Sequence, residues 1–354
     1  MDKIFQGKRI AITGGTGSLG KVLVRRLLSG AEGTPAKVIV FSRDEAKQHF
    51  MRIDYQQRYQ ATDEIIYNNF RNILEFRIGD VRDFGSVVSL LKDADIVINA
   101  AALKQVPSCE YFPAEAVHTN ILGAENIVRA LREHNLPAKT VVGVSTDKAC
   151  KPVNVMGMTK AIQERIFISA NILVPQTRFI CVRYGNVLAS RGSVIPLFHQ
   201  QIEIGGPLTV TTADMTRFLL PLERAVDTII AAVRGANPGE TYIPIIPSAR
   251  VLDVAKAMIG KQNIEIQITG IRPGEKIHES MVSEEEGYHT HRRGEYYVIQ
   301  SMLPEISTRI DDKPLGRDYS SGETVMNLEQ TIALLTEQRL MPGDAIRFDG
   351  EFLR

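Results

Sequence analysis

The sequence is poor in cysteine, has almost no excess of charge of either sign, and contains no long apolar run. Its three cysteines among 354 residues are an odd and scattered set (Cys109, Cys150 and Cys181), so neither a disulfide framework nor a zinc site is expected. Forty-two basic and 41 acidic side chains leave a net charge of +1, which gives no reason to expect nucleic acid or an acidic membrane surface as a partner. No apolar stretch approaches the roughly 18 residues of a transmembrane helix, so no membrane span is predicted.

The remaining bulk features are those of an ordinary soluble protein. Apolar residues make up 44% of the chain and charged residues 23%. The N-terminus passes almost directly into an apolar run at residues 8–14, unlike a signal peptide, so we expect a cytoplasmic protein. Two histidines in the segment 289–293 raise the question of a metal. No cysteine or carboxylate follows them at ligand spacing, so no metal is expected.

Short apolar runs alternate with helical patterns through the first half of the chain. Strands are predicted at 8–14, 37–43, 74–80, 94–101, 140–145 and 178–187. Helices are predicted at 18–29, 113–134 and 156–172. Such alternation is typical of βαβ units. The predicted fold class is therefore α/β, a Rossmann-type doubly wound parallel sheet.

This regularity loosens after about residue 188. Glycine- and proline-containing loops and two amphipathic helices follow, at 205–207, 268–279, 225–235 and 251–260. We predict a sheet domain over residues 1–187. Residues 188–354 would mainly form a smaller C-terminal domain and a C-terminal extension, with some later segments returning to the sheet domain.

The segment TGGTGSLG, residues 13–20, follows the first predicted strand and opens the first predicted helix. In such a turn Gly14 permits the tight bend, Gly17 lets the backbone approach a pyrophosphate, and Gly20 allows close helix–strand packing. Free N–H groups at the helix N-terminus favour phosphates. The segment therefore predicts a dinucleotide-binding turn, whose other members are Thr16, Ser18 and Leu19.

The end of the second predicted strand bears on the choice of cofactor. It reads FSRD, with Ser42 and Arg43 before Asp44. An acidic residue here binds the ribose 2′-hydroxyl of NAD, whereas an arginine accommodates the 2′-phosphate of NADP. Ser42 and Arg43 therefore favour NADP, and Asp44 leaves NAD as the alternative.

Two further strand ends are expected beside the cofactor. Asp80 and Val81 close the third strand and are placed to meet the adenine. Ala100 and Ala101 close the fourth strand, where small side chains let the backbone pass close to the ribose and nicotinamide.

Thr146, Asp147 and Lys148 follow the fifth predicted strand, at the sheet edge where ligands bind in this fold class. Met156 and Lys160 are four residues apart and share one face of the next helix. A short-chain dehydrogenase would carry tyrosine at the first of these positions, and a thioether cannot take a proton from an alcohol. Lys160 can still hold the nicotinamide ribose, so the proton must go to another group.

Five segments carry a resemblance to a known family: TGGTGSLG, AALKQVPSCEYFPAEAVHTNILGAENI, STDKACKPVNVMGMTKA, RYGNVLASRGSVIPLF and IRPGEKIHE. Together they resemble the extended short-chain dehydrogenases that dehydrate UDP-N-acetylglucosamine, from about residue 4 to at least 300. The stretches PSCE and GEYYVIQSMLPE are similar to the capsular-polysaccharide type, which inverts carbon 5. Methionine in place of tyrosine recurs in that branch, so Met156 does not by itself mark an inactive protein.

The resemblance implies a 4,6-dehydration without net redox change. Hydride leaves carbon 4 of the sugar, water is lost across carbons 5 and 6, and hydride returns to carbon 6. Asp147 would protonate the departing hydroxyl, and Thr146 would position the oxygen at carbon 4. Lys148 would take the proton from carbon 5, for which burial beside Lys160 is expected to lower its pKa. The group that deprotonates the carbon 4 hydroxyl stays open among Lys148, Asp147 and a water linked to Lys160.

Inversion requires that carbon 5 be reprotonated from the opposite face. Cys109 and Glu110 lie in the loop after the fourth predicted strand and face the same crevice, so either is a candidate. A buried cysteine also serves as a small apolar filler, and this reading of Cys109 stays open.

The resemblance also implies contacts to a UDP-sugar substrate. Lys104 would meet the sugar or diphosphate, Asn186 lies at the switch from cofactor to substrate, and Glu275 suits a ribose hydroxyl. Three arginines suit diphosphate oxygens: Arg191, Arg217 and Arg272.

The favoured function is thus an inverting dehydratase that makes a UDP-4-keto-6-deoxy-N-acetylhexosamine for surface polysaccharide. The alternatives are a dehydratase that retains carbon 5, on the same or another UDP-sugar, and a non-catalytic sensor of nucleotide sugar or NADP. By analogy with the family a homo-oligomer is expected, with a hexamer among the options.

Overall fold

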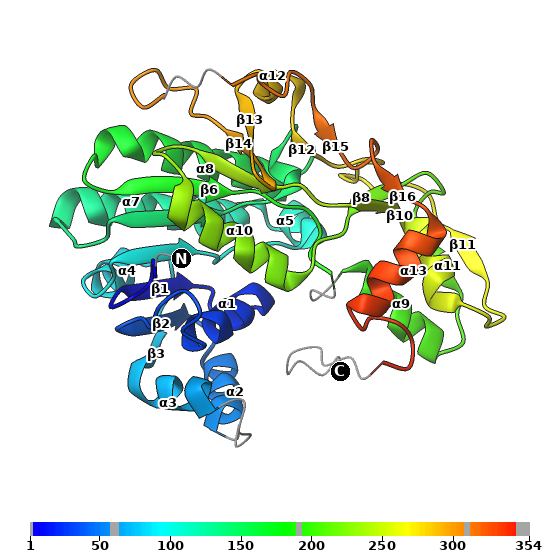
Figure 1. Ribbon diagram of the computed structural model, residues 1–354, viewed down its shortest axis with the longest axis horizontal. Coiled ribbons are helices and arrows are strands. Elements are labelled where there is room, and N and C mark those ends of the chain that lie inside the picture. Colours follow the sequence, from blue (N-terminus) through cyan, green and yellow to red (C-terminus); the bar gives the residue numbers. More distant parts are fainter. Residues whose placement is uncertain (1–2, 57–63, 189–192, 308–311, 345–354) are drawn as a thin grey trace.

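The computed structural model describes residues 3–56, 64–188, 193–307 and 312–344 (Figure 1). Within these residues the largest element is a nine-stranded sheet with the strand order β13-β14-β9-β6-β5-β4-β1-β2-β3. Its strands are β1 (Arg9–Thr13), β2 (Lys37–Ser42), β3 (Leu74–Ile78), β4 (Ile96–Asn99), β5 (Thr140–Val144), β6 (Arg178–Val182), β9 (Thr241–Pro244), β13 (Thr290–Arg293) and β14 (Tyr296–Ile299). The strands from β3 to β9 pair in parallel, and β14 and β13 extend the sheet antiparallel. This order confirms the predicted Rossmann-type sheet.

Helices cover both faces of the sheet (Figure 1). On one face lie α1 (Ser18–Leu28), α2 (Glu45–Gln56), α3 (Glu64–Ile73) and α10 (Leu222–Gly235), and on the other α4 (Phe84–Leu91), α7 (Gly123–His134) and α8 (Val155–Leu173). Successive strand residues point to opposite faces, so Ile10 and Ile12 belong to one buried cluster and Ala11 to the other. A sheet buried on both faces explains why its strands read as continuous apolar runs.

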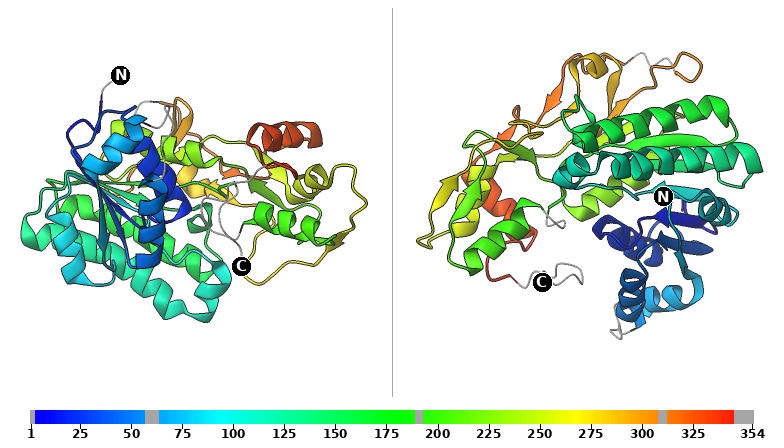
Figure 2. Two further views of the ribbon diagram at one scale, coloured as in Figure 1. Left: turned by 90° about the horizontal axis from the view of Figure 1, so that it is seen from below. Right: turned by 180° about the vertical axis from the view of Figure 1, so that it is seen from behind.

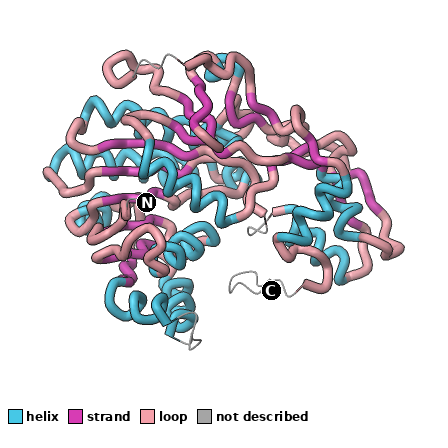
Figure 3. Tube along the Cα trace, viewed as in Figure 1, coloured by secondary structure: helices cyan, strands magenta, loops and turns pink. Residues whose placement is uncertain are grey.

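A smaller unit lies beside the sheet domain and has its own buried cluster (Figures 1 and 2). Its helices are α9 (Val194–Glu203), α11 (Val251–Ile259) and α13 (Leu328–Glu337). Its strands form small sheets from β7 (Leu208–Val210) with β11 (Ile266–Ile268), and from β8 (Thr216–Phe218), β10 (Ser248–Arg250) and β16 (Val325–Met326). The strands β12 (Ser280–Val282) and β15 (Tyr319–Ser320), with α12 (Glu284–Gly287), lie near the edge of the large sheet (Figure 3).

The chain crosses between the two units more than once. After α9, β7 and β8 it returns to the large sheet as α10 and β9, leaves again, and returns as β13 and β14. A single cut between residues 187 and 188 therefore does not separate the units along the chain. The assignment of substrate binding to the later residues stays a prediction.

Two predicted elements differ from the structure most. The predicted helix at 113–134 is divided into α6 (Pro113–Ala116), a π-helical turn η2 (Val117–Leu122) and α7. The predicted strand at 178–187 ends at Val182, and the chain then leaves the sheet edge. A Cβ on Gly185 would lie 2.7 Å from the Phe218 side chain, so the chain packs tightly against β8 here. No helix of the described residues is long and apolar enough to cross a membrane.

Candidate active site

The glycine turn between β1 and α1 has the close contacts that a nucleotide-binding turn requires. Gly14 has a φ of +66°, and a Cβ on it would lie 2.8 Å from the Ala101 backbone nitrogen. A Cβ on Gly20 would lie 2.4 Å from the Gly15 carbonyl oxygen, so helix and turn touch through backbone alone. Gly17 precedes the helix without a side-chain cap. The first N–H groups of α1, carried by Ser18 and Leu19, are therefore available to an anion.

The end of β2 is joined to this turn. Thr16 Oγ1 donates a hydrogen bond of 3.1 Å to Ser42 Oγ, which also accepts one from the Asp44 backbone nitrogen. The Arg43 side chain is 60% exposed, and its guanidinium lies 3.7 Å from the Asp80 carboxylate. A largely solvated guanidinium beside the predicted ribose position can reach a phosphate without breaking a short ion pair.

The third and fourth strands end beside the same turn. Asp80 accepts a hydrogen bond of 2.7 Å from Arg82. Partial burial alone would raise the pKa of Asp80, but the bonds from Arg82 outweigh burial, so this pKa is lowered. Val81 is buried against Gly123 of α7, and Ala100 and Ala101 contact Gly14 through their backbone. These residues therefore lie where a cofactor would pass, with Asp80 kept ionised.

An acid–base cluster lies just beyond β5, on the short 3₁₀ turn η3 (Asp147–Ala149). Thr146 Oγ1 donates to Asp147 Oδ1 at 2.8 Å, and Lys148 Nζ donates to the same oxygen at 3.1 Å. The Glu279 carboxylate lies 3.1 Å from Lys148 Nζ on its other side. Asp147 and Glu279 are buried, and each has one oxygen without a hydrogen-bond partner among the described residues. The cluster therefore holds two carboxylates around one ammonium.

The expected lowering of the Lys148 pKa by burial beside Lys160 is wrong. Burial does act to lower this pKa, but the charges of Asp147 and Glu279 outweigh burial, so the pKa of Lys148 is raised. Lys160 itself hydrogen-bonds to Gln163 at 2.6 Å within α8. Burial lowers the pKa of Lys160 to about 8. The lysine with the lowered pKa is therefore the predicted ribose-binding lysine.

The position of the missing tyrosine is apolar. Met156 is 6% exposed and belongs to a small buried cluster with Cys109 and Ala116. Cys109 Sγ contacts the Leu103 carbonyl oxygen at 3.5 Å, and burial raises the pKa of the thiol to about 11. Glu110 Oε1 accepts a hydrogen bond of 2.7 Å from the Val155 backbone nitrogen, the first residue of α8. Both residues thus contribute to packing and capping, and a catalytic role for either stays a prediction.

Asn120, on the π-helical turn η2, fixes the loop after β4 to helix α8. Its side chain exchanges hydrogen bonds with both backbone groups of Leu103 and donates to Thr159 Oγ1 at 3.0 Å. Asn120 is fully buried. π-Helical turns often occur at functional sites. Asn120 could not be predicted, since a helical pattern does not reveal an inserted residue. Glu279 was not predicted either, although the segment IRPGEKIHE ends on it.

The predicted substrate residues fall into different environments. Arg217 donates to the backbone oxygens of Thr216, Lys276 and Ile277, so its guanidinium is already bonded to the main chain. Arg272 is exposed, and its backbone interacts with Glu275. Lys104 and Asn186 both lie at the sheet edge, and Lys104 is exposed. The side-chain oxygen Oδ1 of Asn186 is buried and has no hydrogen-bond partner in the described part of the chain. Arg191 lies outside the described residues.

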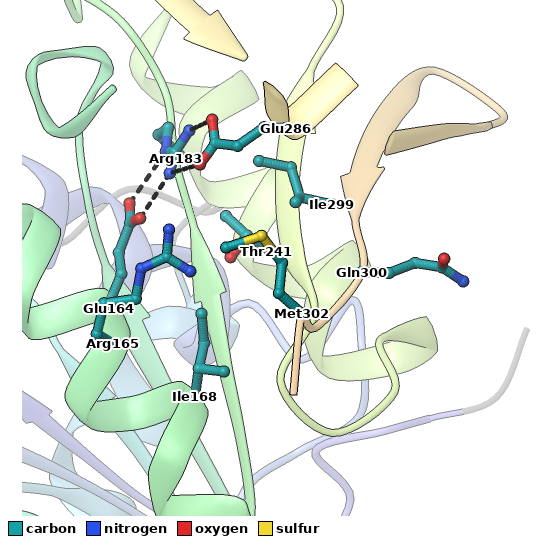
Figure 4. Close-up of a pocket in the computed structure, with 9 residues that line it drawn as sticks. All are labelled: Glu164, Arg165, Ile168, Arg183, Thr241, Glu286, Ile299, Gln300 and Met302. Carbon is teal, nitrogen blue, oxygen red and sulfur yellow. Dashed lines mark hydrogen bonds and ion pairs between the residues drawn. The ribbon is translucent and has the colours of Figure 1, made fainter. Parts of the chain in front are cut away.

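A second ion network, centred on the buried Arg183, joins three elements of the chain (Figure 4). Arg183, which directly follows β6, pairs with Glu164 of α8 at 2.6 Å and with Glu286 of α12 at 2.8 Å. It also donates to the Met281 carbonyl oxygen at 2.8 Å. The network therefore ties the helix that carries Lys160 to the segment that follows Glu279. Among the described residues no group of three or more His, Cys, Asp or Glu side chains is arranged to hold a metal ion.

The strand order, the glycine turn and the lysine-bearing helix α8 together define an extended short-chain dehydrogenase. The chain belongs to the polysaccharide biosynthesis protein family, whose model matches residues 10–301.

Individual relatives carry two different names. The inverting UDP-N-acetylglucosamine 4,6-dehydratase of Campylobacter jejuni subsp. jejuni is 40% identical over 311 residues, which cover 87% of each chain. The UDP-glucose 4-epimerase of Rickettsia bellii is 42% identical over 339 residues, covering 94% of this chain and 91% of that protein. The X-ray structure of Pen from Bacillus thuringiensis superposes with a TM-score of 0.84 at 33% identity, covering 95% of this chain and 99% of Pen.

Proposed function

We propose that this protein is an NADP-dependent UDP-N-acetylglucosamine 4,6-dehydratase that inverts carbon 5. Its product would be a UDP-4-keto-6-deoxy-N-acetylhexosamine used for surface polysaccharide. The observation that carries the proposal is the pair formed by the buried Asp147 and the partly buried Lys148 at the sheet edge, an acid and a base 3.1 Å apart. Loss of water across two carbons needs both groups, one to protonate the leaving hydroxyl and one to accept a carbon-bound proton. The 40% identity to a protein named for this reaction supports it.

The residues present fit a dinucleotide cofactor. A side chain on Gly14 or Gly20 would fill the space at the turn, and the helix N-terminus behind it has no side-chain cap. Ser42 and the solvated Arg43 favour NADP over NAD, which stays the alternative. When bound, the nicotinamide would supply the hydride acceptor and later the hydride donor.

The chain's own groups would then handle protons and orientation. Thr146 would orient the oxygen at carbon 4, and Lys160 would hold the ribose. The buried Asp147 would protonate the leaving hydroxyl at carbon 6. Lys148 would accept the proton of carbon 5, and because its pKa is raised it must first give up a proton. Transfer of that proton to the oxygen of Asp147 or Glu279 that lacks a partner would keep the charge within the cluster.

UDP-sugar 4-epimerisation is the second candidate, favoured by the relatives named UDP-glucose 4-epimerase. Both reactions need a group that moves the proton of the carbon 4 hydroxyl, a role for which Met156 is unsuited, so Met156 does not distinguish an epimerase from a dehydratase. An epimerase needs no acid aimed at carbon 6. A dehydratase that retains carbon 5 and a non-catalytic sensor stay as further alternatives. The acid–base pair of Asp147 and Lys148 argues against a sensor, which has no use for it.

Proton NMR of UDP-N-acetylglucosamine incubated with the protein and NADP in heavy water tests the proposal. A new methyl signal at carbon 6 with deuterium at carbon 5 is expected, with ring couplings that show inversion. Formation of UDP-N-acetylgalactosamine without a methyl signal would favour the epimerase instead. The double variant Asp147→Asn, Lys148→Ala should bind the UDP-sugar normally and give no product. Equal turnover by this variant and the parent would overturn the roles of both residues.

The setting of the reaction is also part of the proposal. We expect a cytoplasmic homo-oligomer, a hexamer among the options, because members of the extended family assemble through helices beside the active site. Sedimentation of the purified protein measures the subunit number directly.

A further inference from the structure

The buried carboxylate of Glu279 contacts the proposed base directly, although it comes from the segment that leads into β12. Its Oε1 lies 3.1 Å from Lys148 Nζ, and the residue is 2% exposed. The Lys148 ammonium therefore lies between Asp147, which follows β5 in the sheet domain, and Glu279, which is far from it in sequence.

The segment that carries Glu279 is held by backbone contacts independent of Lys148. Arg217 of β8 donates to the carbonyl oxygens of Lys276 and Ile277. Ser321, beside β15, accepts a hydrogen bond of 3.0 Å from the Glu279 backbone nitrogen and donates its own N–H to the Glu279 carbonyl oxygen at 2.8 Å. Backbone hydrogen bonds thus fix the segment so that the Glu279 side chain lies against Lys148. A substitution that changes only the carboxylate of Glu279 leaves these backbone hydrogen bonds in place.

The charges around Lys148 come from three elements. Asp147 and Glu279 act on the ammonium as anions, and Arg217 of β8 acts on it as a cation. Lys276 lies 4.0 Å from the second oxygen of Glu279, and its ammonium donates to the Cys150 carbonyl oxygen at 2.7 Å. Without Glu279 the ammonium would face one carboxylate and one guanidinium, so the stabilisation of its charge would be reduced.

We propose that Glu279 is a positioning residue of the reaction centre, which holds the Lys148 ammonium beside Asp147 and keeps it protonated until substrate arrives. The part of this inference that concerns catalysis rests on the proposed function, since Lys148 acts as the base only in that reaction. In the resting protein it concerns the protonation of one lysine, which is measurable without any sugar.

The test is an NMR titration of the protein labelled with carbon-13 at lysine Cε, with the Lys148 signal assigned by its loss in Lys148→Arg. In Glu279→Gln, which keeps the size and the backbone bonds of Glu279, the titration midpoint of Lys148 should fall by about one to three pH units. The matched control is Glu284→Gln, which removes an exposed carboxylate five residues further along and should leave the midpoint unchanged. An unchanged midpoint in Glu279→Gln would overturn the proposal.

A second variant separates position from folding. Glu279→Asp keeps the charge but moves it further from the Lys148 ammonium, which Glu279 contacts at 3.1 Å, so its midpoint should fall, though by less than that of Glu279→Gln. If Glu279→Gln does not fold, a midpoint in Glu279→Asp below that of Glu284→Gln still supports the proposal, and an identical one overturns it. Given turnover of UDP-N-acetylglucosamine, the pH at which kcat reaches half its maximum should fall in Glu279→Gln. Absence of turnover in the parent would overturn the proposed function and leave the titration result standing.

Discussion

The first turn of helix α8 lies directly against the backbone of the acid–base cluster: a Cβ added to Gly157 would stand 2.2 Å from the carbonyl oxygen of Lys148. Real Cβ atoms do not approach an oxygen so closely, so any side chain here must displace helix or turn. Asn154 caps the same turn, because its Oδ1 accepts a hydrogen bond of 2.8 Å from the Gly157 backbone N–H. The start of α8 therefore sets the position of Lys148.

Gly157→Ala should displace this turn, with a loss of about 1–3 kcal/mol in the free energy of unfolding, the usual cost of overpacking. Turnover should fall as well, because Lys148 moves relative to Asp147. Urea unfolding and initial rates measure both effects. Gly85→Ala is the matched control, since its Cβ would meet no atom closer than 3.6 Å. Equal stability and rate for Gly157→Ala and the parent would show that the contact is relieved at no cost.

Met156 should be replaceable by leucine with little effect on activity. The side chain is buried with Cys109, and a thioether transfers no proton, so a hydrophobic residue of similar volume should preserve kcat within about threefold. Met156→Tyr adds volume and a hydroxyl to the same cluster and should cost about 1–3 kcal/mol of stability. Initial rates and urea unfolding of the two variants test this. A large loss of kcat in Met156→Leu with normal stability would instead give the sulfur a role.

Cofactor affinity should decrease as the pH is raised through about 8. The pKa of Lys160 is lowered to about 8, so below this pH its ammonium can bind the cofactor by charge-assisted hydrogen bonds. Above this pH the amine is neutral and those bonds weaken. Isothermal titration of NADP from roughly pH 6.5 to roughly pH 9.5 measures the change. This interval covers the protonation of a lysine whose pKa is about 8. Lys160→Met should bind more weakly at every pH, and its affinity should not vary over this range. A parallel pH dependence in both proteins would locate the titrating group elsewhere.

Arg43 should determine the preference for NADP. Arg43→Ala should raise the Kd for NADP about tenfold, which corresponds to the loss of about 1.4 kcal/mol, while the Kd for NAD stays nearly unchanged. Direct binding titrations with both cofactors make the comparison. Arg129→Ala, which removes an exposed guanidinium paired with Glu133 on α7, is the control and should change neither constant. An equal loss of affinity for both cofactors would mean that Arg43 does not bind the 2′-phosphate of NADP.

Arg183→Met should be strongly destabilising. It leaves the carboxylates of Glu164 and Glu286 buried without their partner, a change that costs about 3–5 kcal/mol. Chemical denaturation at neutral pH measures the loss. Arg224→Ala removes an exposed pair with Glu295 and should cost no more than about 1 kcal/mol. Similar losses in the two variants would mean that burial adds nothing to the Arg183 network.

The same network predicts a sensitivity to acid. Burial alone would raise the pKa of Glu286, but Arg183 outweighs burial and lowers it from 4.5 to about 2. The unfolded chain therefore binds this proton first as pH falls. The stabilisation by Glu286 is complete above about 4.5 and is lost between there and about 2. In Arg183→Met this part of the acid dependence should be absent, so unfolding curves of the two proteins should converge as pH falls. A stability difference between the two proteins that stays constant as pH falls would contradict this prediction.

The first six strands of the large sheet and the glycine turn could be predicted because each is a local pattern, whereas β9, β13 and β14, which follow after the chain has left the sheet, were not. Strands buried on both faces must be apolar throughout, so they can be recognised from the amino-acid sequence. The bend at Gly14 can be recognised too, because it needs a residue that tolerates positive φ. The turn Thr146 to Lys148 was predictable for the same reason, since it directly follows a recognisable strand. The sequence pattern alone did not decide whether Met156 marks an inactive protein. The resemblance to the family indicated that it does not.

The protonation of the site was decided by the tertiary structure. The sequence places Lys148 near Lys160, but it does not reveal that Glu279, more than a hundred residues away, lies 3.1 Å from the Lys148 ammonium, or that Lys160 is bonded to Gln163 instead. A pKa depends on every charge within a few ångströms and on burial, whichever part of the chain supplies them. The sequence by itself therefore determined the Rossmann-type sheet and the residue types at its edge. Only the tertiary structure, which brings Glu279 to Lys148 and buries Lys160, decided which lysine has the raised pKa and which the lowered one.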